Sequence, residues 1–181
     1  MTNNANGHAG GRRYTGGPQT PALVEYKHLK FIIINQPTAA TLPIFIEELK
    51  QLNAGIVVRC CESTYSPKTL AENGIQVVDL QIVDGAPPSN EIIENWLSLV
   101  ATAFEESPEK YIAVHCVAGL GRAPVLVAIA LIEYGMKYAD AVEFIRERRR
   151  GAINAKQLAF LEKYRPKGLW LKRKEKECSI M

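Results

Sequence analysis

The chain has 181 residues, 47% of them apolar, which is enough for one compact domain with its own hydrophobic core. Its formal net charge of +3 is too small to argue for binding to nucleic acid. Four cysteines without regular spacing, no secretory signal and no apolar run long enough to cross a bilayer indicate a reducing, cytosolic compartment with free thiols.

The N-terminal residues 1–20 are rich in Gly, Asn and Thr and poor in aliphatic side chains, so they cannot bury enough apolar surface to order themselves. We therefore expect a flexible tail over residues 1–22. A single folded domain is expected over residues 23–166, followed by a basic tail over residues 167–181.

From His28 onward, apolar strand patterns alternate with an amphipathic helix. Strands are predicted over residues 28–35, 54–61 and 75–82, and the helix over residues 41–52. This alternation is typical of a mostly parallel central sheet flanked by helices on both faces, so the predicted fold class is α/β. Ligands of such sheets bind at the carboxyl edge of the strands.

One more strand, from Tyr111 to Val114, interrupts a later half of the chain that is otherwise helical. Helices are predicted over residues 89–106, 124–135, 138–149 and 154–165, with Gly135 and Gly151 as helix ends. A run of arginines in this region admits two interpretations, a contact for a phosphate-bearing partner or a solvated helix end. We favour the solvated helix end for Arg146, Arg148, Arg149 and Arg150.

The strand from Tyr111 to Val114 leads into the segment HCVAGLGRAP, residues 115–124, which is predicted to be a loop closed by Arg122. Pro124 is favoured in the first turn of a helix, so a helix should start there. The glycines of the loop allow the peptide N–H groups of residues 117–122 to point inward, and the helix adds its positive end. The segment is therefore predicted to cradle an oxyanion.

The residue types in this loop favour phosphoryl transfer to sulfur, with a buried structural thiol beside a surface arginine as the alternative. The guanidinium of Arg122 matches two phosphate oxygens, and Cys116 lies where positive dipoles favour a thiolate. His115 is predicted to orient the loop and to help keep the thiolate. Attack by Cys116 followed by hydrolysis of a cysteinyl-phosphate needs no metal or cofactor. The predicted phosphoryl-binding residues are Val117, Ala118, Gly119, Leu120, Gly121 and Arg122.

HCVAGLGRAP resembles the signature loop of cysteine-based protein tyrosine phosphatases. The sequence from Val114 to Lys167 resembles the phosphatase of regenerating liver family throughout, and the resemblance extends from about Leu23 and resumes at Cys178. It implies a small dual-specificity-type phosphatase with a prenylated tail. The substrates would be phosphotyrosine, phosphoserine or phosphothreonine in proteins, or a phosphoinositide. The family also implies a binding partner, the cytosolic domains of CBS-type magnesium transporters.

This chemistry needs a proton donor for the leaving oxygen, carried by a loop that can close over the substrate. Asp84, in the segment VDGAPPS of residues 83–89, is the candidate, and capping the turn is its alternative role. The resembled family has Trp-Pro and two consecutive acids at this place. Of the two acids, only the second is present here, as Asp84. Leu80, Gln81 and Val83 replace the other residues.

The residue after the arginine departs from the wider phosphatase pattern. Most cysteine phosphatases have Ser or Thr there, whose hydroxyl helps the thiolate to leave, whereas this chain has Ala123. The resembled family shares the alanine, which implies slow turnover and a long-lived cysteinyl-phosphate. Two function classes therefore remain open, an enzyme and a low-activity module that binds a partner through the same pocket.

Cys60 and Cys61 end a predicted strand, and a buried small apolar side chain is the ordinary role of each. Cys61 matches the position of the resembled family that forms a reversible disulfide with the nucleophile. Such a bridge to Cys116 would protect the nucleophile from irreversible oxidation. We expect Cys61 rather than Cys60 to form it.

The C-terminal segment RPKGLWLKRKEKECSIM is basic, since six Lys and Arg residues against two glutamates give a net charge of +4. CSIM fits a prenylation pattern that favours a farnesyl group on Cys178, although Ser179 departs from its aliphatic ideal. One prenyl chain binds a membrane weakly, so the basic residues would add attraction to anionic lipid. We expect the protein at the cytoplasmic face of plasma or endosomal membranes, with a homo-oligomer there left open. A disordered soluble tail is the alternative.

Overall fold

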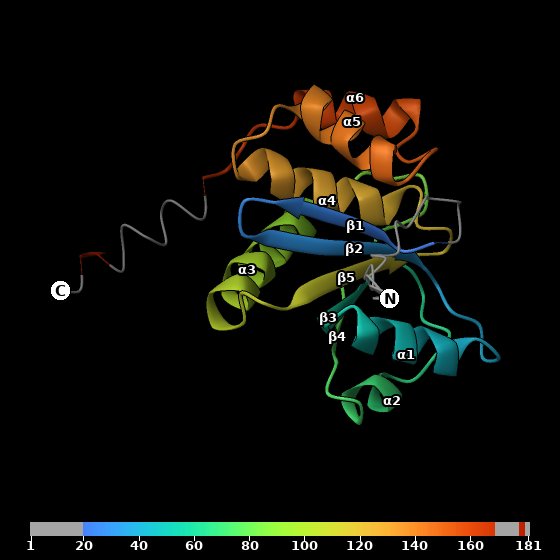
Figure 1. The fold of residues 1–181 in the computed structure, drawn as a ribbon. Helices are drawn as coiled ribbons and strands as arrows, with labels where there is room; N and C mark the ends of the chain where they lie inside the picture. Colours follow the sequence, from blue (N-terminus) through green and yellow to red (C-terminus); the bar gives the residue numbers. More distant parts are fainter. Residues whose placement is uncertain (1–19, 169–177, 180–181) are drawn as a thin grey trace, which may run out of the picture.

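The computed structural model describes residues 20–168 and 178–179, and its centre is a five-stranded sheet in the order β1-β2-β5-β3-β4 (Figure 1). Four strands run parallel, and the first strand of the chain pairs antiparallel to its neighbour at one edge. The strands are β1 (Ala22–Tyr26), β2 (Leu29–Asn35), β3 (Ala54–Arg59), β4 (Gln76–Asp79) and β5 (Tyr111–Cys116).

Helices cover both faces of this sheet, as the α/β prediction requires (Figure 1). On one face lie α1 (Leu42–Gln51) and the short α2 (Pro67–Ala71). On the other lie α3 (Asn90–Glu106) and α4 (Arg122–Glu133), with α5 (Tyr138–Arg148) and α6 (Ala155–Lys163) packed outside α4.

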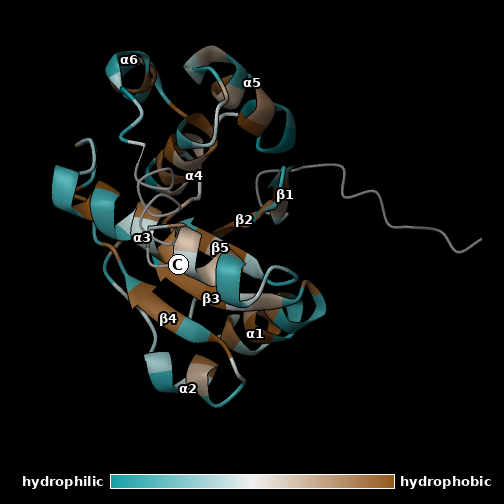
Figure 2. Ribbon diagram, turned by 90° about the vertical axis from the view of Figure 1, so that its left-hand side faces the viewer, coloured by the Kyte–Doolittle hydropathy of each residue, from teal (hydrophilic) through white to brown (hydrophobic). Residues whose placement is uncertain are grey.

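The two cores follow from the alternation of side chains along each strand. In β2, Phe31 and Ile33 point into the core with α3 and α4, while Ile32 and Ile34 point into the core with α1 and α2. The residues of helix α4 are mostly hydrophobic (Figure 2), and the helix is accordingly buried from Ala123 to Glu133. A helix with no solvated face gives the loop before it a rigid support.

Most predicted elements are confirmed within a few residues, but two were missed and one junction was placed wrongly. The prediction had no β1 and no α2, a helix of five residues whose first turn is capped by the Ser66 hydroxyl. Strand β5 continues through His115 and Cys116, because these residues pair with β2. Helix α4 starts at Arg122, so Pro124 is its third residue rather than its first.

Both ends of the domain are fixed to the sheet layers. Strand β1 starts at Ala22, one residue before the predicted domain boundary. Lys167, predicted as the first residue of the tail, donates its backbone N–H to the buried carboxylate of Glu133 on α4 at 2.9 Å. Among the described residues, no helix has both the length and the apolar character needed to span a bilayer.

Candidate active site

The loop between β5 and α4 lies at the carboxyl edge of the sheet and has its carbonyl groups turned outward. Each carbonyl of residues 117–121 accepts a hydrogen bond from a group outside the loop: Gln36 N, Arg149 Nη2, Arg149 Nε, Ile153 N and Val125 N. Among the described residues, the N–H groups of residues 117–121 have no protein acceptor. They are therefore available to an anion. Phosphate binding by this loop stays a prediction.

Arg149 organises this arrangement from behind the loop. Its side chain is only 2% exposed, and its guanidinium donates to the carbonyls of Ala118 at 2.9 Å and Gly119 at 3.1 Å. The same group donates to the Thr20 carbonyl at 2.7 Å and to the Asn35 side chain. Burial lowers the pKa of Arg149, and attraction to Cys116 opposes that effect. The prediction of a solvated helix end is wrong for this residue.

The backbone of the loop needs glycine at Gly119. Its φ is +66°, and a Cβ atom there would lie 2.7 Å from Arg149 Nη2 and 2.8 Å from the Ile34 carbonyl oxygen. Any larger residue would therefore push the loop away from the arginine that holds it. Gly121 is different, because a Cβ atom there would meet only the flexible end of Gln157, at 2.8 Å.

His115 precedes Cys116 on β5 and lies in a buried chain of hydrogen bonds. The Tyr65 hydroxyl lies 2.6 Å from Nε2, and Nδ1 lies 3.3 Å from the Cys116 carbonyl oxygen. The Cys116 carbonyl can only accept, so Nδ1 carries the ring proton and Nε2 accepts from the Tyr65 hydroxyl. Burial raises the pKa of Tyr65, so the phenol keeps the proton that it donates. Burial lowers the pKa of His115 to about 4, so the ring is neutral at pH 7. His115 thus orients the loop, but it brings no positive charge to Cys116.

A second polar group extends this chain to the edge of the sheet. The buried guanidinium of Arg59 makes two bonds to Asp79, at 2.6 and 2.8 Å, and one to the Tyr65 carbonyl at 2.7 Å. The hydrogen bonds from Arg59 lower the pKa of Asp79. Sequence reasoning did not find Arg59, Asp79 or Tyr65, because Tyr65 lies 50 residues before His115 in the sequence and only the fold brings them together.

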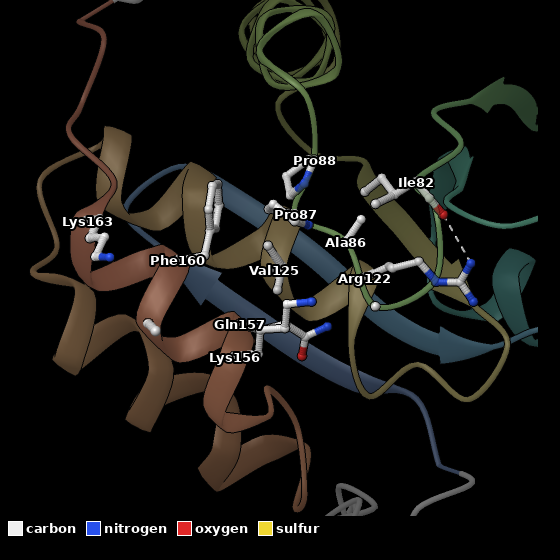
Figure 3. Close-up of a pocket in the computed structure, with 12 residues that line it drawn as sticks. Ile82, Ala86, Pro87, Pro88, Arg122, Val125, Lys156, Gln157, Phe160 and Lys163 are labelled. Atoms are coloured by element: carbon white, nitrogen blue, oxygen red, sulfur yellow. Dashed lines mark hydrogen bonds between the residues drawn. The ribbon is translucent and has the colours of Figure 1, made fainter.

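Arg122 and Asp84 meet at the open side of the loop. Arg122 Nη1 donates to the Ile82 carbonyl at 3.1 Å (Figure 3). Arg122 Nη2 lies 3.8 Å from Asp84 Oδ1. The Arg122 side chain is 12% exposed, whereas that of Asp84 is 90% exposed. The arginine is thus held in place by the Asp84 segment, while the carboxylate that pairs with it is exposed to solvent.

The catalytic domain model of the dual specificity phosphatases matches residues 38–166. Protein tyrosine phosphatase type IVA 3 of Homo sapiens is 61% identical over 147 residues, covering 81% of this chain and 85% of that protein. PRL-1 phosphatase of Drosophila melanogaster is 52% identical over 163 residues, covering 88% of this chain and 92% of that protein. The chain belongs to the type IVA, or PRL, family of protein tyrosine phosphatases.

A solved structure supports the same assignment for this PRL-family phosphatase. A chain from Leishmania major, named as a protein tyrosine phosphatase, is 38% identical and superposes with a TM-score of 0.74. The similarity covers 81% of this chain and 99% of that chain. The predicted family and the predicted phosphatase activity are therefore confirmed, and phosphoproteins are the kind of substrate that the relatives indicate.

The mouth of the active site of this PRL-family phosphatase is a cavity of about 660 Å³. Its lining includes Arg122, Asp84 and Val117 from the expected site, together with Cys61 and Gln36. Val117 is 60% exposed, so it forms part of the rim rather than the floor.

The predicted disulfide concerns this same mouth. Cys61 lines the cavity and its thiol donates to Gln36 Oε1 at 3.3 Å, whereas Cys60 is fully buried and is not part of the lining. Burial raises the pKa of both thiols. A bridge between Cys61 and Cys116 stays a prediction. Peptide mapping after mild peroxide treatment tests it, and a bridge from Cys60 instead would contradict it.

Proposed function

We propose that this chain is a membrane-associated protein tyrosine phosphatase that works through a cysteinyl-phosphate and turns over slowly. The Cys116 sulfur attacks phosphorus while the bond to the leaving oxygen breaks, and Asp84 gives that oxygen its proton. Water then hydrolyses the thiophosphate bond and releases phosphate. The observation that carries the proposal is the row of N–H groups that follows Cys116, at residues 117–121, none of which has an acceptor in the described part of the chain, with Arg122 next in sequence.

Slow turnover is supported by the residue after Arg122. Ala123 is fully buried in the first turn of α4 and has no hydroxyl that could donate to the departing thiolate. The second step would then be slower than the first, and the phosphoenzyme would accumulate. The same feature supports a second candidate function, a module that binds CBS-type magnesium transporters through this pocket with little catalysis.

Rapid-mixing kinetics with an aryl phosphate test the mechanism and separate the two functions. We expect a burst of product, followed by a slow steady state in wild type, a faster steady state in Ala123→Ser, and no turnover in Cys116→Ser. A rate in Cys116→Ser equal to wild type would contradict the covalent mechanism. Steady-state turnover is compared with affinity for the transporter domains in the same variants. Tight binding with negligible wild-type turnover would favour the binding module.

A further inference from the structure

A second, mainly apolar groove of about 300 Å³ begins beside the active site. It lies between the segment after Asp84, the start of α4 and one side of α6, and Figure 3 shows Arg122 at one end and Lys163 at the other. Its remaining lining residues are Ile82, Gly85, Ala86, Pro87, Pro88, Val125, Lys156, Gln157, Ala159 and Phe160.

This groove is continuous with the mouth of the active site. Ile82 and Arg122 line both cavities. Arg122 is also the side chain that is expected to hold the phosphoryl group, and its guanidinium is fixed by the Ile82 carbonyl. A substrate whose phosphate lies on Arg122 would therefore have the opening of the groove directly beside it.

The two cavities differ in charge. The mouth includes two acidic residues, Glu62 and Asp84, among its lining residues. The groove has no acidic residue among its lining residues, and it carries the exposed amines of Lys156 and Lys163 on α6. An acidic group of a substrate is therefore attracted to the groove side and repelled on the opposite side.

We propose that the groove binds a bulky apolar side chain of the phosphoprotein substrate, with an acidic residue next to it in the sequence. This inference rests on the proposed function, since it names the substrate that the same site accepts. Proline and aliphatic walls exclude water from an apolar side chain, and the lysines at the rim receive the carboxylate. A volume of about 300 Å³ is at the low end of small-ligand pockets, which suits a single side chain of the size of Leu or Phe.

The inference is tested with phosphotyrosine peptides in which the pair Leu-Glu is moved along either side of the phosphotyrosine. At one spacing, we expect kcat/KM to be about tenfold higher for Leu-Glu than for Ser-Glu, because the leucine is buried. At that spacing, kcat/KM should also be higher for the Leu-Glu peptide than for the Leu-Lys peptide. All rates are divided by the rate on a small aryl phosphate, which does not reach the groove.

Three variants on α6 and one on α2 locate the effect. Ala159→Gln fills the groove from an exposed position and should remove the preference for leucine, whereas Ala155→Gln, on the same helix outside the lining, should keep it. Lys163→Glu should reverse the preference between Glu and Lys. Lys68→Glu makes the same charge change on α2, on the other face of the sheet, and should leave the preference between Glu and Lys unchanged.

Equal rates for leucine and serine at every spacing would overturn the inference. The inference would also be overturned if Ala159→Gln changed the rate on a short-chain phosphoinositide and left the rates on the peptides unchanged. That result would assign the groove to a lipid. A variant truncated after Lys167 gives a further test. If the leucine preference appears only in this variant, the groove belongs to the chain's own last residues, and the inference is overturned. Failure of the proposed catalysis is distinguishable, because the affinity of Cys116→Ser for the same peptides still measures the groove.

Discussion

Single residues outside the signature loop decide whether that loop can bind phosphate. A ring of inward N–H groups requires outward carbonyls, and buried carbonyls without donors are costly, at roughly 1–3 kcal/mol each. Arg149 supplies donors to two of these carbonyls and also bonds to Thr20 and Asn35, so one side chain links the loop to β2 and to the residues before β1. It is therefore a positioning residue for phosphate binding.

Replacing Arg149 by lysine should weaken phosphate binding more than it weakens the fold. Lysine keeps the positive charge but lacks the planar fork that bridges the carbonyls of Ala118 and Gly119. We expect kcat/KM to fall by about tenfold to a hundredfold, because one or two hydrogen bonds that shape the transition-state site are lost. The affinity for inorganic phosphate should fall in parallel. Arg148→Lys is the matched control, because Arg148 bonds to the Phe144 carbonyl and stacks on its ring.

If Arg149→Lys loses stability but binds phosphate as wild type does, Arg149 has only a structural role. Urea unfolding measured beside the phosphate affinity separates the two outcomes.

The residues of the site that lie close together in the sequence were predictable from it. The cysteine, glycines and arginine of HCVAGLGRAP lie within ten consecutive residues, so a phosphate-binding loop could be predicted without knowing the fold. Arg149 is 30 residues from Gly119, and a run of arginines on a helix most often indicates a solvated surface. Only the packing of α5 against the loop shows that one of the four is buried.

The elements around the site are linked by a polar chain that runs from the exposed carboxylate of Asp79 on β4 through the buried side chains of Arg59 on β3 and Tyr65 to His115 on β5. This chain explains how the sheet holds the residue next to Cys116. It also contains a buried base, because His115 is 0% exposed and its pKa is lowered to about 4 by burial.

The neutral state of His115 should make the fold sensitive to mild acid. Below its ordinary pKa of about 6.5, the unfolded chain binds a proton that the folded chain takes up only near pH 4. Stability therefore falls as pH drops from about 6.5 to about 4, by a total on the order of 3 kcal/mol from this residue. Asp79 acts in the same direction at lower pH, since its pKa is lowered by Arg59.

Urea unfolding across this pH range measures the effect. His115→Gln should have a flatter dependence of the free energy of unfolding on pH, and His28→Gln, which removes an exposed imidazole, is the matched control. A wild-type slope in His115→Gln would mean that another group causes the acid sensitivity.

The prediction of elements failed where short pieces depend on tertiary partners. β1 has the half-buried pattern of an edge strand, and only its pairing with β2 distinguishes it from an extension of the tail. α2 has five residues, too few for a periodic pattern. The long segments α3 and α4 were predictable, because their apolar patterns extend over several turns.

For the whole molecule, the course of the chain after α6 connects the catalytic domain to the C-terminal segment. Lys167 bonds through its backbone to Glu133 on α4, and its amine reaches Asn90 and Glu94 on α3. The described chain therefore reaches Gly168 beside the start of α3. Pro88, which lines the apolar groove, lies two residues before α3 begins, so the C-terminal segment leaves the domain near the groove. Most of the basic segment that follows lies outside the described residues, and Cys178 is exposed.

Membrane association should require both the lipid and the basic residues of this segment. A farnesyl group on Cys178, as proposed, would anchor weakly, and each nearby Lys or Arg would add on the order of 1 kcal/mol at an anionic surface. Cys178→Ser should therefore release the protein to the cytosol. Neutral replacement of Lys172, Arg173, Lys174 and Lys176 should weaken attachment, whereas neutral replacement of Lys50 and Lys68 on α1 and α2 is the control.

High salt should detach the wild type only in part, because it screens charge and leaves the lipid inserted. Fractionation of cells expressing these variants gives the result, and Cys178→Ser found on membranes as fully as wild type would show that CSIM is not the anchor.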